Sequence, residues 1–178
     1  YIKELIGKSN RTKQDKLTPY IEENDLLRLL DDLESRDSSL FLAVGLISIF
    51  GLRLSELAVL RIVDGKLYVG NIKNNINTKA KKEDRRVFPM DLIEKKNLGK
   101  KLIKLFESEK ITLPIPVLNQ IKMVKDKNRY GDVGQALRQL IERNKVWKEI
   151  IKTNPEITPY SLRHRYAHQC HKGSTIPI

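Results

Sequence analysis

LFLAVGLISIFGLRLSEL, residues 40–57, is the stretch from which the rest of the chain can be interpreted. Its first part, residues 40–50, is apolar on every side of a helix, which is typical of a helix buried in a core. Gly51 is expected to end this helix, and a second apolar stripe follows. Arg53 lies between these two segments, and a buried guanidinium is costly without a partner. Arg53 therefore either pairs with Glu56 or points into a functional site.

The net charge of the chain, +12, is concentrated in its later part. Residues 1–50 contain seven Lys/Arg and nine Asp/Glu (−2), whereas residues 51–178 contain 27 Lys/Arg and 13 Asp/Glu (+14). This skew favours a polyanionic partner, nucleic acid first and an anionic membrane surface second. The longest apolar run is far shorter than the ~20 residues of a membrane span, and the single cysteine, Cys170, fits a reducing compartment. We expect a cytoplasmic protein with no membrane partner.

Apolar periodicity and end signals predict a mainly α protein of the α+β class. Helices are expected to begin at Thr18-Pro19, Ser38-Ser39, Ser55, Asp91 and Thr158-Pro159, and one long helix is expected over residues 132–151. Pro114 and Pro116 predict a loop, and buried positions in the long helix include Trp147.

The pattern of residues 62–89 differs and predicts a small antiparallel sheet, with a turn at Asp64-Gly65. Residues 1–16 are polar and aperiodic, so we interpret them as a linker or the tail of a missing N-terminal DNA-binding domain. Residues 17–178 then form one domain.

A basic band covers residues 73–104, with eleven Lys/Arg and four acids. For the helix after Asp91, a solvated face is the simpler explanation. The turn of the sheet is different, because it presents clustered cations suited to a phosphate backbone or a groove. These cations are Lys79, Lys81, Lys82, Arg85 and Arg86.

Arg163 follows Arg53 by 110 residues, at the start of another helix, with the basic turn between them in sequence. Two guanidiniums can clamp the non-bridging oxygens of a phosphodiester and offset the charge of its transition state. A lysine could protonate the leaving oxygen, and a histidine-like group could manage the proton of the nucleophile. The spacing is compatible with metal-free phosphoryl transfer.

Three motifs carry a resemblance to a known family. Residues 51–57, GLRLSEL, resemble the first arginine box (G-L-R-x-S-E-L) of the tyrosine recombinase, or phage integrase, family. Residues 157–167, ITPYSLRHRYA, resemble the second box (T-P-H-x-L-R-H-x-x-A), and residues 78–89 are similar to the lysine hairpin that ends in a basic-apolar-apolar-Pro strand. The three motifs occur in the family order, and the resemblance covers about residues 17–178.

The resemblance implies a helical catalytic domain with a small sheet that performs site-specific DNA recombination. One strand would be cut through a 3′-phosphotyrosyl intermediate and rejoined to another, on double-stranded DNA, in a homotetramer, without cofactor or metal. Arg53 and Arg163 would clamp the phosphate, and Glu56 and His164 would support the site. The general acid would be Lys79 or Lys81, and DNA contacts would come from Lys82, Arg85, Arg86 and Arg165.

The chain departs from the family pattern in two ways. Tyr160 stands where the family usually has histidine, and tyrosine is a poor base near neutral pH because its ordinary pKa is about 10. The chain also ends fifteen residues after Arg163, so the nucleophilic tyrosine is expected beyond Ile178. Tyr166 lies too close to Arg163 for that role and is assigned to the core. The alternative is a non-catalytic or degenerate recombinase-like DNA-binding module.

His164, His168 and His171 recur on one face of a helix, with Cys170 nearby. This spacing could hold zinc. Because no second cluster supplies further ligands, we expect no metal site.

Overall fold

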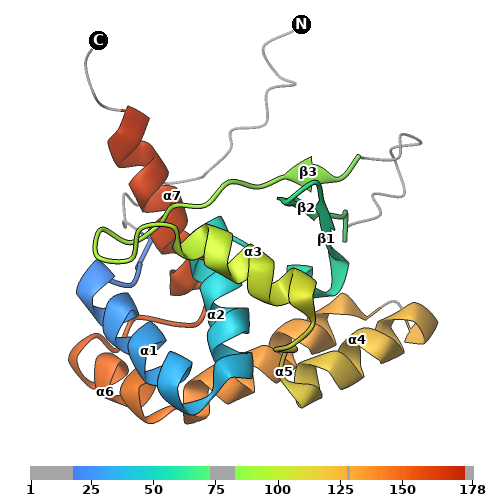
Figure 1. Ribbon diagram of the computed structural model, residues 1–178. Coiled ribbons are helices and arrows are strands. Elements are labelled where there is room, and N and C mark those ends of the chain that lie inside the picture. The colour runs from blue at the N-terminus through green and yellow to red at the C-terminus, as the bar shows by residue number, and fades with distance from the viewer. Residues whose placement is uncertain (1–17, 73–82, 128, 175–178) are drawn as a thin grey trace, which may run out of the picture.

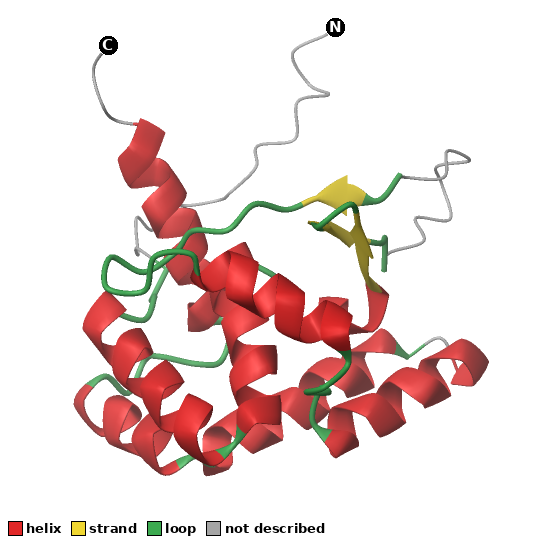
Figure 2. Ribbon diagram, in the orientation of Figure 1, coloured by secondary structure: helices red, strands yellow, loops and turns green. Residues whose placement is uncertain are grey.

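The computed structural model describes residues 18–72, 83–127 and 129–174 (Figure 1). The described part is mainly helical, and Figure 2 shows a small antiparallel sheet at one edge of the helical body. The mainly α, α+β class predicted from the sequence is confirmed. Residues 1–16, the expected linker, lie outside the described residues. None of the described helices has the length and apolarity that a membrane span requires.

Helix α2 (Ser38–Phe50) is the centre of the core, as its sequence predicted. Every residue from 40 to 50 is buried. The helix begins where the carboxylate of Asp37 accepts a hydrogen bond from the backbone N–H of Leu40 (3.0 Å). It ends at Gly51, whose φ of +66° is left-handed and therefore favours glycine.

The other helices surround α2 in a single body. Helices α1, α3, α5 and α7 contact α2, while α4 and α6 pack against α5. Their bounds are α1 (Glu23–Arg36), the 3₁₀ helix η1 (Leu54–Val59), α3 (Leu98–Ser108), α4 (Ile115–Lys127), α5 (Tyr130–Arg143), α6 (Lys145–Thr153) and α7 (Ser161–Ser174).

The sheet has the order β1-β2-β3 and is antiparallel throughout. Strands β1 (Leu60–Val63) and β2 (Lys66–Val69) are joined by Asp64-Gly65, and both turn residues have positive φ, as a tight hairpin requires. Strand β3 (Arg85–Arg86) pairs with β2. The predicted sheet is thus confirmed, although it begins at Leu60 and its last strand is shorter than expected.

Helices α1 and α3 begin several residues later than predicted. Helix α1 begins at Glu23 rather than at Thr18, because the preceding segment is extended and Ile21 donates a backbone hydrogen bond to Ser161 of α7 (3.3 Å). Helix α3 begins at Leu98 rather than at Asp91.

The carboxylate of Asp91 still caps α3, but it does so from the preceding loop. It accepts hydrogen bonds from the backbone N–H groups of Asn97 (3.0 Å) and Gly99 (2.7 Å). Asp91 therefore does serve the start of this helix, as predicted, but the helix itself begins seven residues later than predicted.

The second half of the chain holds one more break and one more helix than expected. Helix α4 begins directly after Pro114 and has Pro116 in its first turn. Proline is tolerated there because the first backbone N–H groups of a helix have no partner within the helix. The predicted helix over 132–151 is two helices, α5 and α6, which are separated by Asn144. The Asn144 side chain accepts a hydrogen bond from Trp147 N–H (2.9 Å) and starts α6, whose Trp147 is buried as predicted.

Candidate functional site

Arg53 lies in the turn that follows α2, at the entrance to η1. Its backbone N–H donates to Oε2 of Glu56 (2.7 Å), and the N–H of Glu56 donates back to the carbonyl of Arg53 (3.0 Å). This reciprocal pair of bonds fixes the turn, while the Arg53 side chain remains exposed. The Glu56 side chain therefore supports Arg53 by binding the backbone of Arg53.

The second oxygen of the Glu56 carboxylate binds Arg85. Oε1 accepts a hydrogen bond from Nη2 of Arg85 at 2.7 Å. Glu56 is only 4% exposed, whereas the Arg85 side chain is 50% exposed. One buried carboxylate thus connects the turn after α2 with the edge strand of the sheet.

Arg163 on α7 joins this group although it is distant in sequence. Burial lowers the pKa of Arg163, the positive charge of Arg53 lowers it further, Glu56 raises it, and Arg85 lowers it. Nη1 of Arg163 is buried and has no hydrogen-bond partner among the described residues. Arg163 therefore lies near enough to Arg53, Glu56 and Arg85 to interact with their charges. We call Arg53, Glu56, Arg85 and Arg163 the arginine cluster.

A close contact between α7 and the end of α2 sets the position of Arg163. The ring of Tyr166 lies against Gly51, and its hydroxyl donates to the carbonyl of Phe88 (2.9 Å). Tyr166 is therefore a half-buried packing residue at the side of the core, whereas a core position was predicted for it.

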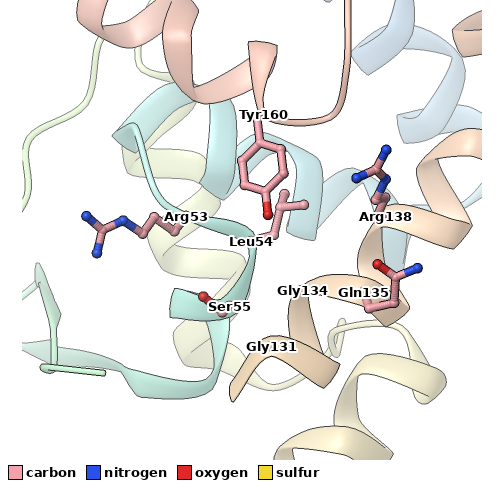
Figure 3. Close-up of a pocket in the computed structure, with 8 residues that line it drawn as sticks. All are labelled: Arg53, Leu54, Ser55, Gly131, Gly134, Gln135, Arg138 and Tyr160. Carbon is pink, nitrogen blue, oxygen red and sulfur yellow. The ribbon is translucent and has the colours of Figure 1, made fainter. Parts of the chain in front are cut away.

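Tyr160 lines a pocket of about 140 Å³ beside Arg53. Figure 3 shows Tyr160 above Leu54, with its hydroxyl directed into the pocket and with Arg53 and Arg138 on opposite sides of the ring. Tyr160 is 50% exposed. The structure thus brings Tyr160 to the same region as Arg53.

Helix α5 supplies the wall of this pocket, which we did not predict from the sequence. Four residues of α5 recur at i, i+3, i+4 and i+7, and this spacing is the signal that could have revealed them, because it marks one face of the helix beside the face that buries Val133 and Leu137. The four residues are Gly131, Gly134, Gln135 and Arg138.

Arg165 corrects one expectation. It is 1% exposed, and its guanidinium donates to the carbonyls of Met90 (2.7 Å) and Asp91 (3.2 Å) and lies 3.6 Å from the carboxylate of Glu23. A guanidinium held this way inside the protein does not contact DNA. Arg165 instead fastens α7 to the loop before α3 and to the start of α1.

The other candidate residues are less constrained. His164 is half-buried, and burial together with the charge of Arg163 lowers its pKa. Arg86 is exposed, with its guanidinium carbon 4.4 Å from the centroid of the Phe88 ring. Lys79, Lys81 and Lys82 lie outside the described residues, so the choice between the two candidate general acids stays a prediction.

The ring of His168 stacks on Tyr20 with the two centroids 3.9 Å apart. Within residues 18–72, 83–127 and 129–174, no group of three or more His, Cys, Asp or Glu side chains is placed to hold a metal ion.

Comparisons with family models, with curated proteins and with solved structures found no match for this chain. The resemblance to tyrosine recombinases therefore depends on the three sequence motifs and remains a prediction.

Proposed function

We propose that this protein is a site-specific DNA recombinase of the tyrosine type. One observation supports the proposal most directly: the buried, unpartnered Nη1 of Arg163 lies in a cluster that holds three guanidiniums and one carboxylate. A buried guanidinium nitrogen without a partner is costly, and like charges repel one another. An anionic ligand would relieve both costs at once.

The phosphodiester of DNA is the anion that fits this cluster best. Planar guanidiniums bind two phosphate oxygens at a time, and the net charge of +14 in residues 51–178 favours a polyanion. With Glu56 counted, the arginine cluster carries a net charge of +2. This matches the two negative charges on the pentavalent transition state of a phosphodiester, which has one negative charge in its ground state.

The reaction needs no metal when arginines offset this charge. A tyrosine oxygen would give up its proton to a general base and attack phosphorus, the bond from phosphorus to the 5′ oxygen would break, and the 5′ oxygen would take a proton from a general acid. Rejoining is the reverse reaction with a different 5′ hydroxyl. The resemblance assigns the acid to Lys79 or Lys81 and implies a nucleophilic tyrosine and a homotetramer on two duplexes.

Tyr160 favours a second candidate function, a recombinase-like module that binds DNA without cutting it. A tyrosine here can donate a hydrogen bond to a phosphate oxygen, but it does not replace histidine as a base near neutral pH. Its half-exposed position beside Arg53 suits the binding role equally well.

Trapping of a covalent intermediate tests the proposal. The protein, expressed from its complete reading frame, would first select its preferred duplex from a random-sequence pool. That duplex, nicked near its centre so that the cut strand is lost, would then be incubated with the protein, and covalent adducts would be counted on a denaturing gel.

The wild type is expected to form adducts, whereas Arg53→Ala and Arg163→Ala should form none while their DNA affinity falls only several-fold. Arg61→Ala is the matched control, because Arg61 pairs with Asp84 (2.8 Å) outside the arginine cluster. Adducts formed by both cluster variants at the wild-type rate would contradict the proposal. Selective binding without any adduct would establish the non-catalytic module instead.

A further inference from the structure

We infer that Arg85 is a third phosphate-contacting arginine, which Glu56 holds ready for the transition state. The inference rests on the proposed function and goes beyond it, because the family resemblance assigns Arg85 only to general DNA contact. The evidence is the position of Arg85 within the cluster: it hydrogen-bonds the buried Glu56 at 2.7 Å and lowers the pKa of Arg163.

The geometry of Glu56 makes Arg85 part of the same unit as Arg53. One carboxylate oxygen binds the backbone N–H of Arg53 and the other binds Nη2 of Arg85. Glu56, which is itself fixed by burial, therefore positions the backbone of Arg53 and the guanidinium of Arg85. Pre-positioning of the Arg85 guanidinium reduces the reorganisation that it would otherwise need during the reaction.

Arg85 also has N–H groups that its bond to Glu56 does not use. A guanidinium has five N–H groups, and the bond to Glu56 uses a single nitrogen of Arg85, whose side chain is half exposed. The ion pair is half exposed on the Arg85 side and buried on the Glu56 side, so Arg85 also neutralises a buried carboxylate. Arg85 can therefore stay paired with Glu56 and still present N–H groups to a ligand.

The charge balance of the cluster indicates that Arg85 stabilises the transition state more than the ground state. Arg53, Arg163 and Glu56 together carry +1, which matches a ground-state phosphodiester, and Arg85 raises the total to +2, which matches the pentavalent transition state. Loss of Arg85 should then reduce the rate of cleavage more than it reduces DNA affinity.

Arg61 provides an internal comparison on the same sheet. It also forms an ion pair, with Asp84 at 2.8 Å, and its side chain is similarly exposed (62%). Its partner lies outside the arginine cluster. Arg61→Ala therefore removes the same kind of surface arginine without changing the proposed phosphate site.

Two measurements on each variant test the inference. The first is a titration with inorganic phosphate, followed through the arginine Nε–Hε signals by NMR, which needs no nucleophile. The second is the rate of adduct formation on the selected nicked duplex at saturating DNA, with DNA affinity measured separately. Unfolding in urea would verify that each variant is folded, and Arg85→Lys keeps a charge beside Glu56 if Arg85→Ala does not fold.

Arg85→Ala should bind phosphate about tenfold more weakly and form adducts about 100-fold more slowly, the usual scale for losing one transition-state donor, while DNA affinity falls only several-fold. Arg85→Lys should be intermediate in rate, and Arg61→Ala should match the wild type. If Arg85→Ala, or Arg85→Lys where Arg85→Ala does not fold, behaved like Arg61→Ala while Arg53→Ala lost phosphate binding, the inference would be overturned and the proposed function would stand. If Arg53→Ala and Arg163→Ala also bound phosphate normally, both the inference and the proposed function would be contradicted.

Discussion

The ring of Tyr166 lies against the backbone of Gly51, so closely that a Cβ on residue 51 would come within 2.5 Å of Tyr166 Cδ1. Gly51 also has a left-handed φ of +66°. Glycine is therefore required twice at this position, once for the turn after α2 and once for the approach of α7. Because Arg163 lies on α7 one turn before Tyr166, the same contact determines how near Arg163 comes to Arg53.

Gly51→Ala should destabilise the protein by about 2–5 kcal/mol, which combines the left-handed strain with the steric conflict of an overpacked core. Gly65→Ala is the matched control, because Gly65 has a φ of +69° and would meet nothing within 4 Å. It should cost only the strain, about 1–2 kcal/mol. Urea unfolding measures both variants. Equal losses at the two glycines would mean that the Tyr166 contact is not tight.

Removing the charge of Glu56 should destabilise the protein in a salt-dependent way. Glu56→Gln keeps the shape of the side chain but leaves three guanidiniums without a counter-charge, so we expect a loss of about 1–3 kcal/mol at low salt. Added salt screens repulsion between the arginines, so 1 M NaCl should restore part of the loss.

Asp84→Asn, which disrupts an exposed ion pair with Arg61, is the control for this experiment. Its cost should be below about 1 kcal/mol. Urea unfolding at low and high salt provides the comparison. A loss in Glu56→Gln that does not change with salt would show that hydrogen bonding, and not charge, is the main contribution of Glu56.

The parts of the fold that were predicted from the sequence depend on local signals. The mostly apolar stretch of residues 40–50 is typical of a buried helix, and Gly51 is a strong helix end. The missed helix α4 and the break at Asn144 follow from signals with two meanings. Pro116 can interrupt a helix or occupy its first turn, and asparagine can lie within a helix or cap one.

The candidate site was less predictable, because it is assembled by tertiary contacts. The resemblance grouped Arg53, Glu56 and Arg163. The bond from Glu56 to Arg85 depends on how the sheet edge meets η1, and one sequence does not specify this. Arg165 was predicted to contact DNA and is instead buried. Nothing in its sequence neighbourhood distinguishes a buried arginine from an exposed one.

His164 should make the protein less stable in mild acid. Burial, with the charge of Arg163, lowers its pKa in the folded state below the ordinary value of about 6.5. The unfolded chain therefore takes up a proton first as the pH falls, and the free energy of unfolding decreases from about pH 6.5 downward, until the folded-state pKa is passed.

His164→Gln removes this titration. Urea unfolding at pH 7.5 and pH 5.5 should show a larger loss in the wild type than in the variant. The pKa of Glu34, which Lys101 lowers, affects stability below its ordinary value of 4.5 and therefore outside this range. Equal losses in the two proteins would contradict the role given to His164.

Arg163 and Arg165 should respond in opposite ways to the same substitution. Methionine keeps much of the apolar stem of arginine and removes its charge. Arg163→Met removes a buried nitrogen without a partner among the described residues and also relieves repulsion from Arg53, so stability should be retained or should rise by up to about 1 kcal/mol. Adduct formation should disappear, because Arg163 is the residue that we assign to the phosphate.

Arg165→Met should instead cost about 2–4 kcal/mol, because the carbonyls of Met90 and Asp91 lose a charged donor inside the protein. At a temperature where this variant is still folded, its DNA affinity should match that of the wild type. Urea unfolding and DNA titration on the two variants make the comparison. If Arg165→Met were fully stable but had lost DNA affinity, the buried position of its guanidinium would be wrong and the original DNA-contact prediction would be restored.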